Sequence, residues 1–268
     1  MKRSGTLVLT EGRSGSNWLG SLTNVTGLLG SCEEWIDARH SGVEPGSVSL
    51  DDFISAVLDK ASTPNSYFCI KLFPRHLFKV QNAYDRDLIT ELQRRFDTQL
   101  IVLQRRDRLA QAISFARAYQ TGAWQSTDNE KRDPDYSFDA ICRSYFFVQR
   151  SYDFWETYLD LRSLDASKFY YEDMMDDCAP YMDAVRDHAG IQAFRHSGIQ
   201  AEASDTPSES KLSIQRDTLN DEWRVQFVED LKVKNMLPSS LPRPPVLTGQ
   251  NLVNFLRQRP TKPKPFTW

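Results

Sequence analysis

The sequence predicts an α/β fold with a three-layer, mostly parallel sheet. Short apolar runs rich in β-branched and aromatic residues alternate with longer helical patterns, which is typical of parallel strands joined by helical crossovers. A Gly/Ser-rich turn joins the first apolar run to the first helical pattern. A chain of 268 residues, 40% of them hydrophobic, can bury a core of this kind without a metal or disulfides.

The elements follow one another as such a sheet requires. Four runs have the pattern of buried strands: residues 5–10, 67–72, 98–103 and 168–171. Helical periodicity predicts helices over residues 85–96, 107–121, 137–161, 174–189 and 219–232. After the Gly/Ser turn, apolar residues recur at helical spacing and a glycine is a candidate C-cap: Trp18, Leu19, Leu22, Val25 and Gly27.

The composition suggests one domain and a tail. Residues 1–237 are predicted to form the domain, in which the polar stretch 201–210 is a loop. Residues 238–268 are rich in proline and are expected to run extended over the surface. The short apolar segment 252–256 within this tail is a candidate for docking on the domain or on a second subunit.

Charge and cysteine usage argue against several functions. A net charge of −3 gives no basic excess for coating nucleic acid. The cysteines are Cys32, Cys69, Cys142 and Cys178, too far apart for zinc-finger spacing, so no metal is expected. No apolar stretch is long enough to span a membrane, and the first apolar run is too short for a signal peptide. We therefore expect a cytoplasmic protein with free thiols.

The turn after the first strand has the residues of an anion site. It consists of Gly12, Arg13, Ser14, Gly15, Ser16 and Asn17 and runs into a helix. A strand–turn–helix unit directs backbone N–H groups and the positive end of a helix dipole at one point. The spacing matches neither the ATP-binding motif GxxxxGK[ST], whose lysine is missing, nor the dinucleotide motif GxGxxG. An ordinary turn between strand and helix is the alternative.

A second cationic group follows the third strand. Arg105, Arg106 and Arg108 come directly after it, at the end of a parallel sheet where ligands bind. Arg105 is expected to bind a second phosphate, with Ser114 supplying a hydroxyl two turns along the next helix. The alternative for Arg106 and Arg108 is pairing with Asp107 at the helix start. Two such sites on adjacent turns suit a ligand with separated phosphates, such as a 3′,5′-bisphosphorylated adenosine.

Several motifs, in order, carry a resemblance to a known family. Residues 13–19 (RSGSNWL) resemble the 5′-phosphosulfate loop of sulfotransferases, and Arg105-x-Asp107 with residues 111–115 resembles their 3′-phosphate motif. Further matches are Glu34-Trp35, Lys71-Leu72, an RAxQTxxW run over 117–124, an aromatic helix at 154–159, YED at 171–173 and DEW at 221–223. The finer pattern is similar to that of the bacterial carbohydrate sulfotransferases, the family of trehalose 2-sulfotransferases and of nodulation-factor and lipopolysaccharide sulfotransferases.

The resemblance implies a sulfotransferase fold and a donor, 3′-phosphoadenosine 5′-phosphosulfate (PAPS), that leaves as the bisphosphate PAP. The phosphosulfate would lie on residues 12–17, with Arg13 stabilising the leaving phosphate, and the 3′-phosphate on Arg105 and Ser114. Glu34 would be the general base for a hydroxyl of a carbohydrate or related small molecule. Relatives are often dimers, which makes a homodimer possible. The sequence departs from the family at Ser31-Cys32, where Glu-Pro is expected, and at Arg106, which replaces a proline.

Other residues are candidates for the acceptor side. Trp35 and His40 would line the acceptor pocket, and Lys71 would touch the sulfate or the acceptor, or pair with Glu34. Tyr119 and Trp124 would stack on a ring or serve packing. His76 is expected at the surface or half-buried. The YED turn is expected to organise the site.

Two other functions remain open at this stage. One is a small-molecule kinase with a degenerate phosphate loop. The other is a non-catalytic protein that binds PAP and leaves PAPS intact.

Overall fold

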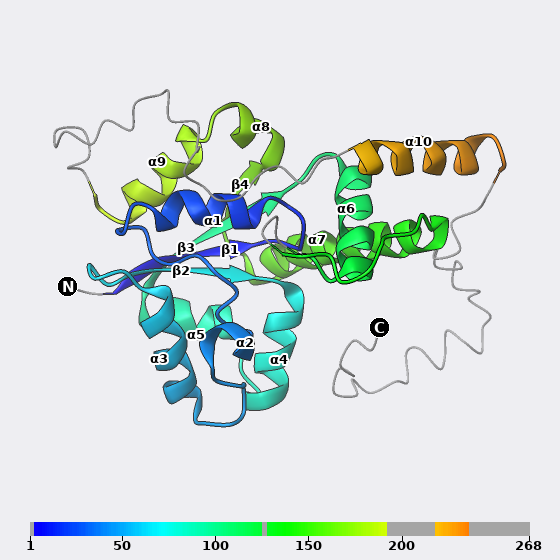
Figure 1. Ribbon diagram of the computed structural model, residues 1–268. Coiled ribbons are helices and arrows are strands. Elements are labelled where there is room, and N and C mark those ends of the chain that lie inside the picture. The colour runs from blue at the N-terminus through cyan, green and yellow to red at the C-terminus, as the bar shows by residue number, and fades with distance from the viewer. Residues whose placement is uncertain (1–2, 125–127, 192–217, 236–268) are drawn as a thin grey trace, which may run out of the picture.

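The fold is a parallel sheet covered by helices on both faces (Figure 1). The computed structural model describes residues 3–124, 128–191 and 218–235. Its strands are β1 (Ser4–Leu9), β2 (Tyr67–Leu72), β3 (Asp97–Gln104) and β4 (Ser167–Tyr170). They pair in the order β2-β1-β3-β4 and every pair is parallel. The predicted fold class is confirmed, and each strand lies within one residue of its predicted bounds.

The described helices divide between the two faces and one end of the sheet. They are α1 (Ser16–Asn24), α2 (Ala38–Ser41), α3 (Leu50–Ala61), α4 (Pro74–Tyr84), α5 (Leu88–Arg95), α6 (Arg108–Thr121), α7 (Phe138–Arg162), α8 (Tyr171–Asp176), α9 (Ala179–His188) and α10 (Thr218–Lys232). Helices α3, α4, α5 and α7 pack on one face of the sheet, whereas α1, α8 and α9 pack on the other. Helix α10 packs on α6 and α7 through Trp223 and Phe227.

Strands β1 and β2 and the second half of β3 are largely apolar because both of their faces are covered. Leu7, Leu9 and Val102 point into one core and Val8 and Ile101 into the other, all with 3% or less of their surface exposed. Alternate side chains of a strand point to opposite faces, so a strand covered on both sides is apolar throughout. This is why short continuous apolar runs, without alternation, located the sheet.

Helix caps account for the boundaries of two predicted helices, α6 and α7. The Asp107 side chain accepts a hydrogen bond from Ala110 N and begins α6, and Ser137 does the same for α7. Gly122 ends α6 in the left-handed conformation, with φ of 73°. Such caps satisfy backbone groups that would otherwise be unpaired at helix ends.

Some predicted elements are wrong in extent. The helix expected over 174–189 is two helices, α8 and α9, because Pro180 lies in the first turn of α9 and cannot extend a helix from before it. The helix expected over 85–96 begins at Leu88, after the left-handed Asp85 and the cap Asp87. Val25, expected on the buried stripe, follows the end of α1 and is 73% exposed.

Two buried features escaped the pattern analysis. Helix α3 lies between β1 and β2, and α4 follows β2; the sequence pattern predicted neither of them. His76 in α4 is 1% exposed rather than half-buried, and burial lowers the pKa of its imidazole well below the usual value. Its Nδ1 accepts a hydrogen bond from Phe73 N at 3.3 Å, so this histidine stabilises the start of the helix.

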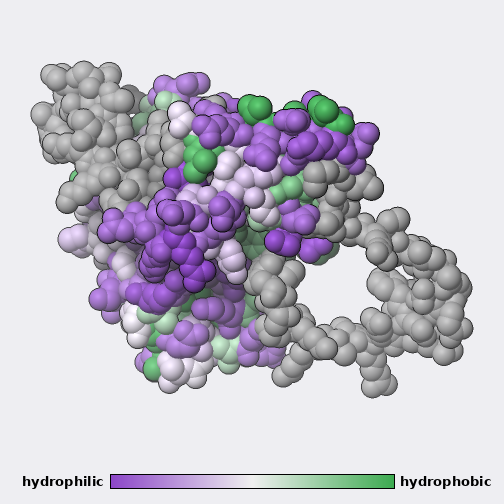
Figure 2. Space-filling model, turned by 45° about the vertical axis from the view of Figure 1, so that its right-hand side comes forward, coloured by the Kyte–Doolittle hydropathy of each residue, from purple (hydrophilic) through white to green (hydrophobic). Residues whose placement is uncertain are grey.

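The surface view shows mainly hydrophilic side chains on the face turned towards the reader (Figure 2). No helix among residues 3–124, 128–191 and 218–235 is long and apolar enough to cross a membrane. The predicted loop 201–210, the tail 238–268 and the segment 252–256 lie outside the described residues.

Replacing Trp155 by Phe should destabilise the fold. Trp155 is fully buried in α7, and its Nε1 donates a hydrogen bond to Thr10 O at 2.9 Å, at the end of β1. The variant loses packing and leaves a buried carbonyl unpaired, so we expect the free energy of unfolding to fall by about 1–3 kcal/mol. Urea denaturation measures this. Leu161→Ala, at a position in the same helix that is 78% exposed, is the control and should change it by less than about 0.5 kcal/mol. Equal losses for the two variants would contradict the role given to Trp155.

Candidate active site

The candidate site lies where the loops after β1 and β3 meet. These strands are neighbours in the sheet and run in the same direction, so both loops leave from its carboxyl edge. The chain order reverses at this point, since β2 lies on one side of β1 and β3 on the other. Open α/β sheets bind ligands at such a switch point. The two predicted anion sites are therefore adjacent.

The loop after β1 needs glycine at one position. Gly15 has a φ of +88°, and a Cβ added there would lie 2.2 Å from Cδ2 of Tyr171. Gly15 is also the N-cap of α1, and no side chain caps that helix end. The N–H groups of the first turn of α1 therefore have no side-chain cap and can receive an anion.

The two serines of this loop are largely internal. Ser14 is fully buried, and its Oγ lies 2.7 Å from Oγ1 of Thr10, which is also 2.9 Å from Leu103 O. This contact fixes the loop to β1 and β3. Ser16 begins α1 and is 6% exposed. The Ser14 side chain therefore stabilises the loop from the protein interior.

Arg13 connects the two predicted anion sites. Its Nε donates to Ser114 Oγ at 2.8 Å, and its Nη1 donates to Trp124 O. The pKa of Arg13 is lowered to about 10, first by burial and next by the positive charges of Arg105 and Arg117. Positive groups gathered in a partly dry site attract a multivalent anion.

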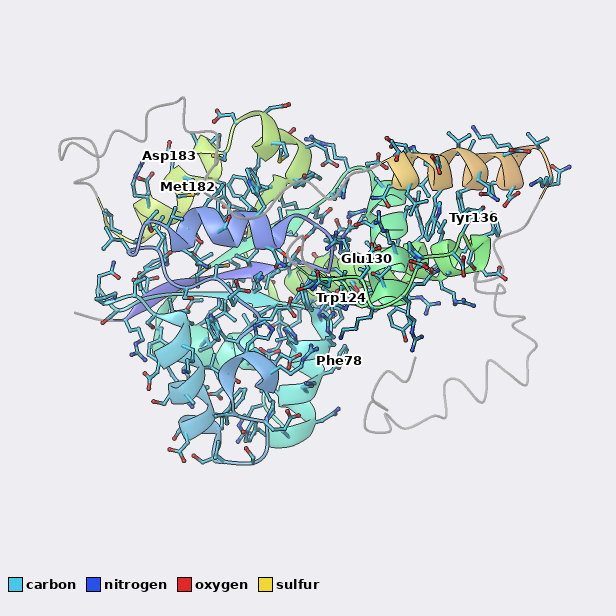
Figure 3. The ribbon with its side chains drawn as sticks, in the orientation of Figure 1. Phe78, Trp124, Glu130, Tyr136, Met182 and Asp183 are labelled. Atoms are coloured by element: carbon cyan, nitrogen blue, oxygen red, sulfur yellow. The ribbon has the colours of Figure 1, made fainter. Side chains whose placement is uncertain are left out.

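Aromatic side chains pack at Gly12, the residue before this arginine. Trp124 packs edge-to-face on Phe115, with ring centroids 5.3 Å apart. A Cβ added at Gly12 would lie 3.1 Å from Phe115 Cε2 and 3.9 Å from Trp124 Cζ3. Figure 3 shows Trp124 and Glu130 beyond the carboxyl ends of the strands, on the side of α6. Trp124 therefore packs over the loop, as the packing alternative for this residue predicts, whereas Tyr119 is 75% exposed.

Arg105 lies across the site from Arg13. Its guanidinium is over the Tyr171 ring, 5.0 Å from the centroid, and its side chain is 18% exposed. Its Nε is buried without a hydrogen-bond partner among the described residues and lies 3.8 Å from Oε1 of Glu172. A buried donor of this kind carries a cost that an anionic ligand would remove.

The turn at residues 171–173 holds the Arg105 loop, as the sequence suggested. Glu172 accepts hydrogen bonds from the backbone N–H groups of Arg106, at 2.9 Å, and Asp107, at 3.1 Å. Asp173 pairs with the guanidinium of Arg106. These contacts fix the backbone on either side of Arg105.

The partners expected for the neighbouring arginines are wrong. Arg108 does not pair with Asp107 but stacks 3.8 Å from the centroid of Tyr152, with Nη2 2.8 Å from Oε1 of Gln104. Arg106 pairs with Asp173. The partner of Asp107 is Arg224 from α10, at 2.7 Å. Arg224 comes from a segment distant in sequence, so helical spacing could not reveal it.

Lys71 and Asn17 join the loop to the predicted acceptor side. Lys71 is fully buried, and its Nζ lies 2.5 Å from Oδ1 of Asn17 and 3.0 Å from Oε2 of Glu33. The ion-pair partner of the lysine is therefore Glu33, and not Glu34 as the sequence suggested. Glu34 is 21% exposed, and its Oε2 lies 3.9 Å from Nη2 of Arg75.

Trp35 and His40 follow Glu34 in the chain. The Trp35 Nε1 donates to Ser31 O at 2.5 Å, and its ring packs against the core. His40 is exposed, in α2, with its ring 6.5 Å from that of Trp35. Neither residue contacts Arg13 or Arg105 among the described residues, and their role in acceptor binding stays a prediction.

Sequence reasoning missed Glu11. This carboxylate precedes the Gly/Ser turn and is only 1% exposed. It accepts hydrogen bonds from Gly12 N at 2.8 Å, Arg75 Nη1 at 2.7 Å and Ser151 Oγ at 2.8 Å. Its position between a buried strand and a glycine was the only sequence signal for a buried acid. The sequence could not indicate its partners, because they lie on α4 and α7.

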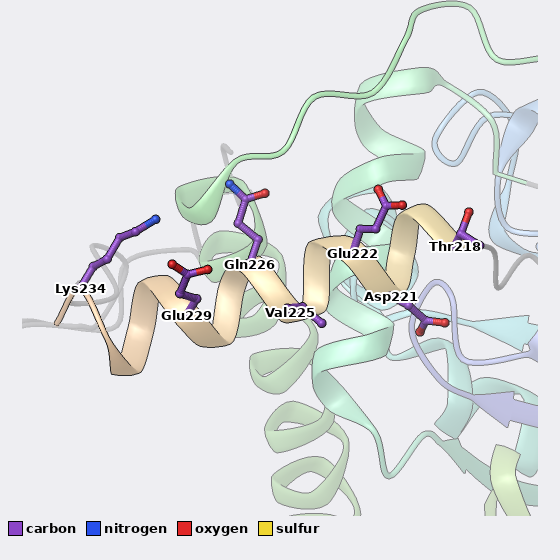
Figure 4. A pocket seen from close by; sticks show the side chains of 7 residues that line it. All are labelled: Thr218, Asp221, Glu222, Val225, Gln226, Glu229 and Lys234. Atoms are coloured by element: carbon purple, nitrogen blue, oxygen red, sulfur yellow. The ribbon is translucent and has the colours of Figure 1, made fainter.

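A shallow pocket elsewhere on the surface does not suit an anion. Figure 4 shows it on α10, lined by Thr218, Asp221, Glu222, Val225, Gln226, Glu229 and Lys234. Its lining has three carboxylates for one lysine. No group of three or more histidine, cysteine, aspartate or glutamate side chains in the described part of the chain is placed to hold a metal ion.

Comparison with known proteins gives one family. The model of the Stf0 sulphotransferase family matches residues 5–230. The match therefore runs from β1 to α10 and includes both loops of the candidate site. No curated protein matches the sequence.

Replacing Gly15 by Ala should disturb the loop. An alanine must adopt a left-handed backbone and displace the Tyr171 ring, so we expect a loss of about 2 kcal/mol or more in stability, measured by urea denaturation. Gly27→Ala is the matched control, because Gly27 has a φ of +62° with nothing within 4 Å of its added Cβ. The control should lose only about 1 kcal/mol. A Gly15 variant no less stable than this control would contradict the close packing of Tyr171.

Proposed function

Because the chain belongs to the Stf0 sulphotransferase family, we propose that its reaction is transfer of a sulfuryl group from PAPS to a hydroxyl of a carbohydrate or related small molecule. The observation that carries the proposal is the joint cationic site, in which Arg13 from the first loop contacts Ser114, near Arg105 of the second. A single phosphate would need only one of these loops. PAPS carries its 3′-phosphate apart from its 5′-phosphosulfate and can use both.

The 5′-phosphosulfate would lie on the loop from Gly12 to Asn17. The N–H groups at the start of α1 would hold its oxygens, and Arg13 would stabilise the charge that develops on the leaving phosphate. The 3′-phosphate would bind Arg105 and Ser114. The Ser114 oxygen accepts from Arg13, so its own O–H is available to donate to the phosphate.

The acceptor would approach from the side of Glu34. In the step we propose, the Glu34 carboxylate takes the proton of the acceptor hydroxyl as the oxygen forms a bond to sulfur. The bond from sulfur to the 5′-phosphate oxygen breaks, and PAP leaves with that electron pair. The geometry resembles in-line phosphoryl transfer, where positioning and charge stabilisation carry catalysis.

The charges near Glu34 favour an uncharged acceptor. In the ion pairs of the described residues on this side, three carboxylates, from Glu11, Glu33 and Glu34, share the two cations of Lys71 and Arg75. An anionic acceptor would meet an excess of negative charge there, whereas a neutral hydroxyl compound would not. This supports a neutral sugar over an acidic one.

Replacing Arg105 by Ala should weaken binding of PAP far more than binding of AMP. AMP lacks the 3′-phosphate, so we expect about a 10–100-fold loss for PAP and less than about threefold for AMP, measured by calorimetric titration. Arg94→Ala is the control, because this arginine lies on α5 with a side chain that is 65% exposed, and both affinities should stay unchanged. Equal losses of affinity for PAP and AMP would contradict the assignment of the 3′-phosphate to Arg105.

Replacing Glu34 by Gln should remove the base and spare donor binding. We expect turnover of radiolabelled PAPS to fall about 100-fold or more with unchanged PAP affinity. Glu44→Gln, at an exposed position in the following loop, is the control and should keep its turnover. Near-normal turnover of the Glu34 variant would mean that another group acts as base. A protein that binds PAP and turns over no acceptor in either form would be a binding protein.

A further inference from the structure

Arg75 lies between the donor loop and Glu34. Its side chain is 42% exposed and comes from the first turn of α4, directly after Pro74. Nη1 lies 2.7 Å from Oε1 of Glu11, and Nη2 lies 3.9 Å from Oε2 of Glu34. One planar group therefore contacts two carboxylates from different segments.

The Glu11 end of this connection is fixed. Glu11 is buried, and both of its carboxylate oxygens have partners: Oε1 accepts from Gly12 N and Arg75, and Oε2 accepts from Ser151 Oγ. A buried charge is tolerated only when it is paired and hydrogen-bonded. Glu11 thus ties the guanidinium to the backbone of the donor loop, at the residue before Arg13.

The guanidinium is also held from below. It lies over the ring of Phe73, 4.1 Å from the centroid. Stacking on an aromatic face while bonding to a carboxylate uses the planar, forked shape of arginine, which lysine lacks. The position of Nη2 next to Glu34 is therefore set by Glu11 and Phe73 rather than by Glu34 itself.

The backbone of the Glu34 segment is fixed from the other side. Lys71 N donates to Glu33 O at 3.0 Å, and Asp37 N donates to Glu34 O at 2.9 Å. These bonds hold the main chain but leave the Glu34 side chain to its own contacts. Among the described residues, the ion-pair partner of the Glu34 carboxylate is Arg75.

We propose that Arg75 is a positioning residue that sets the Glu34 carboxylate in register with the donor loop, through Glu11. This inference rests on the proposed function, since it assigns Arg75 to the base of that reaction. It predicts that Arg75 acts on turnover only through Glu34. A displacement of about 1 Å of a reacting group can cost about 100-fold in rate, so loss of this contact should be visible in kcat.

A double-mutant cycle tests the proposal. The variants are Arg75→Lys, Glu34→Gln and the double variant, with Arg86→Lys as a matched exposed control just beyond the same helix. Single-turnover transfer is followed from saturating radiolabelled PAPS to a fixed mixture of glucose, N-acetylglucosamine and trehalose. We expect Arg75→Lys to lower the rate about tenfold or more in the native background and less than about twofold in the Glu34→Gln background. PAP affinity should stay within about threefold of the native value.

The outcomes separate this inference from the proposed function. An equal loss in both backgrounds would overturn the positioning role of Arg75 and leave Glu34 as the base. A loss of PAP affinity that accounts for the lower rate would also overturn it, by making Arg75 a donor-binding residue. Near-normal turnover of Glu34→Gln alone would contradict the proposed base itself. A second variant excludes an effect of leaving the buried Glu11 charge poorly paired. Glu11→Gln combined with Arg75→Gln replaces the ion pair by a neutral contact and should fold. It should also lower the rate in the native background but not in the Glu34→Gln background.

Discussion

The structure depends on keeping Arg13 half-buried beside other positive charges. Arg13 has a pKa lowered to about 10 by burial and by Arg105 and Arg117, so its charge is held in the site at a cost. Its Nε donates to Ser114 Oγ and its Nη1 to Trp124 O, while the negative charge of Asp128 acts on its pKa in the opposite direction. The rest of the fold supplies the support that keeps this arrangement in place.

That support comes from all of the strands and from both faces of the sheet. Tyr171, directly after β4, packs against Gly15 on one side and lies beneath Arg105 on the other, so one ring spaces the two loops. Glu172 fixes the backbone after Arg105, and Trp155 from α7 fixes the end of β1. On the acceptor side, Lys71 at the end of β2 ties α1 to Glu33. Sulfuryl transfer without covalent help from the protein requires this kind of rigid placement.

The sequence predicted those parts of the site that follow from the chain's local order. A turn after a buried strand must lie at the edge of the sheet, so Arg13 and Arg105 could be placed on that edge without coordinates. That the loops are adjacent was an inference from the parallel sheet, and the strand order bears it out. Helices α6 and α7 were also predictable, because Asp107 and Ser137 are N-cap residues that can be recognised in the sequence.

Contacts between distant segments could not be predicted in this way. Glu11 meets Arg75 and Ser151, and Asp107 meets Arg224, across 64, 140 and 117 residues of sequence. Nothing in a local pattern indicates such pairs, and the local alternative for Asp107, pairing with Arg108, was wrong. The break between α8 and α9 was missed although Pro180 marks it, because apolar periodicity continued across the gap.

The measurement that tests the central claim most directly is a calorimetric titration of the native protein with PAP, AMP and Mg-ATP, the first two in the presence of a chelator. Two separated phosphate sites built from Arg13 and Arg105 predict tight PAP binding without metal and much weaker binding of AMP. Absence of PAP binding, or a preference for Mg-ATP, would contradict the two-site account and favour a kinase or an unrelated binding function.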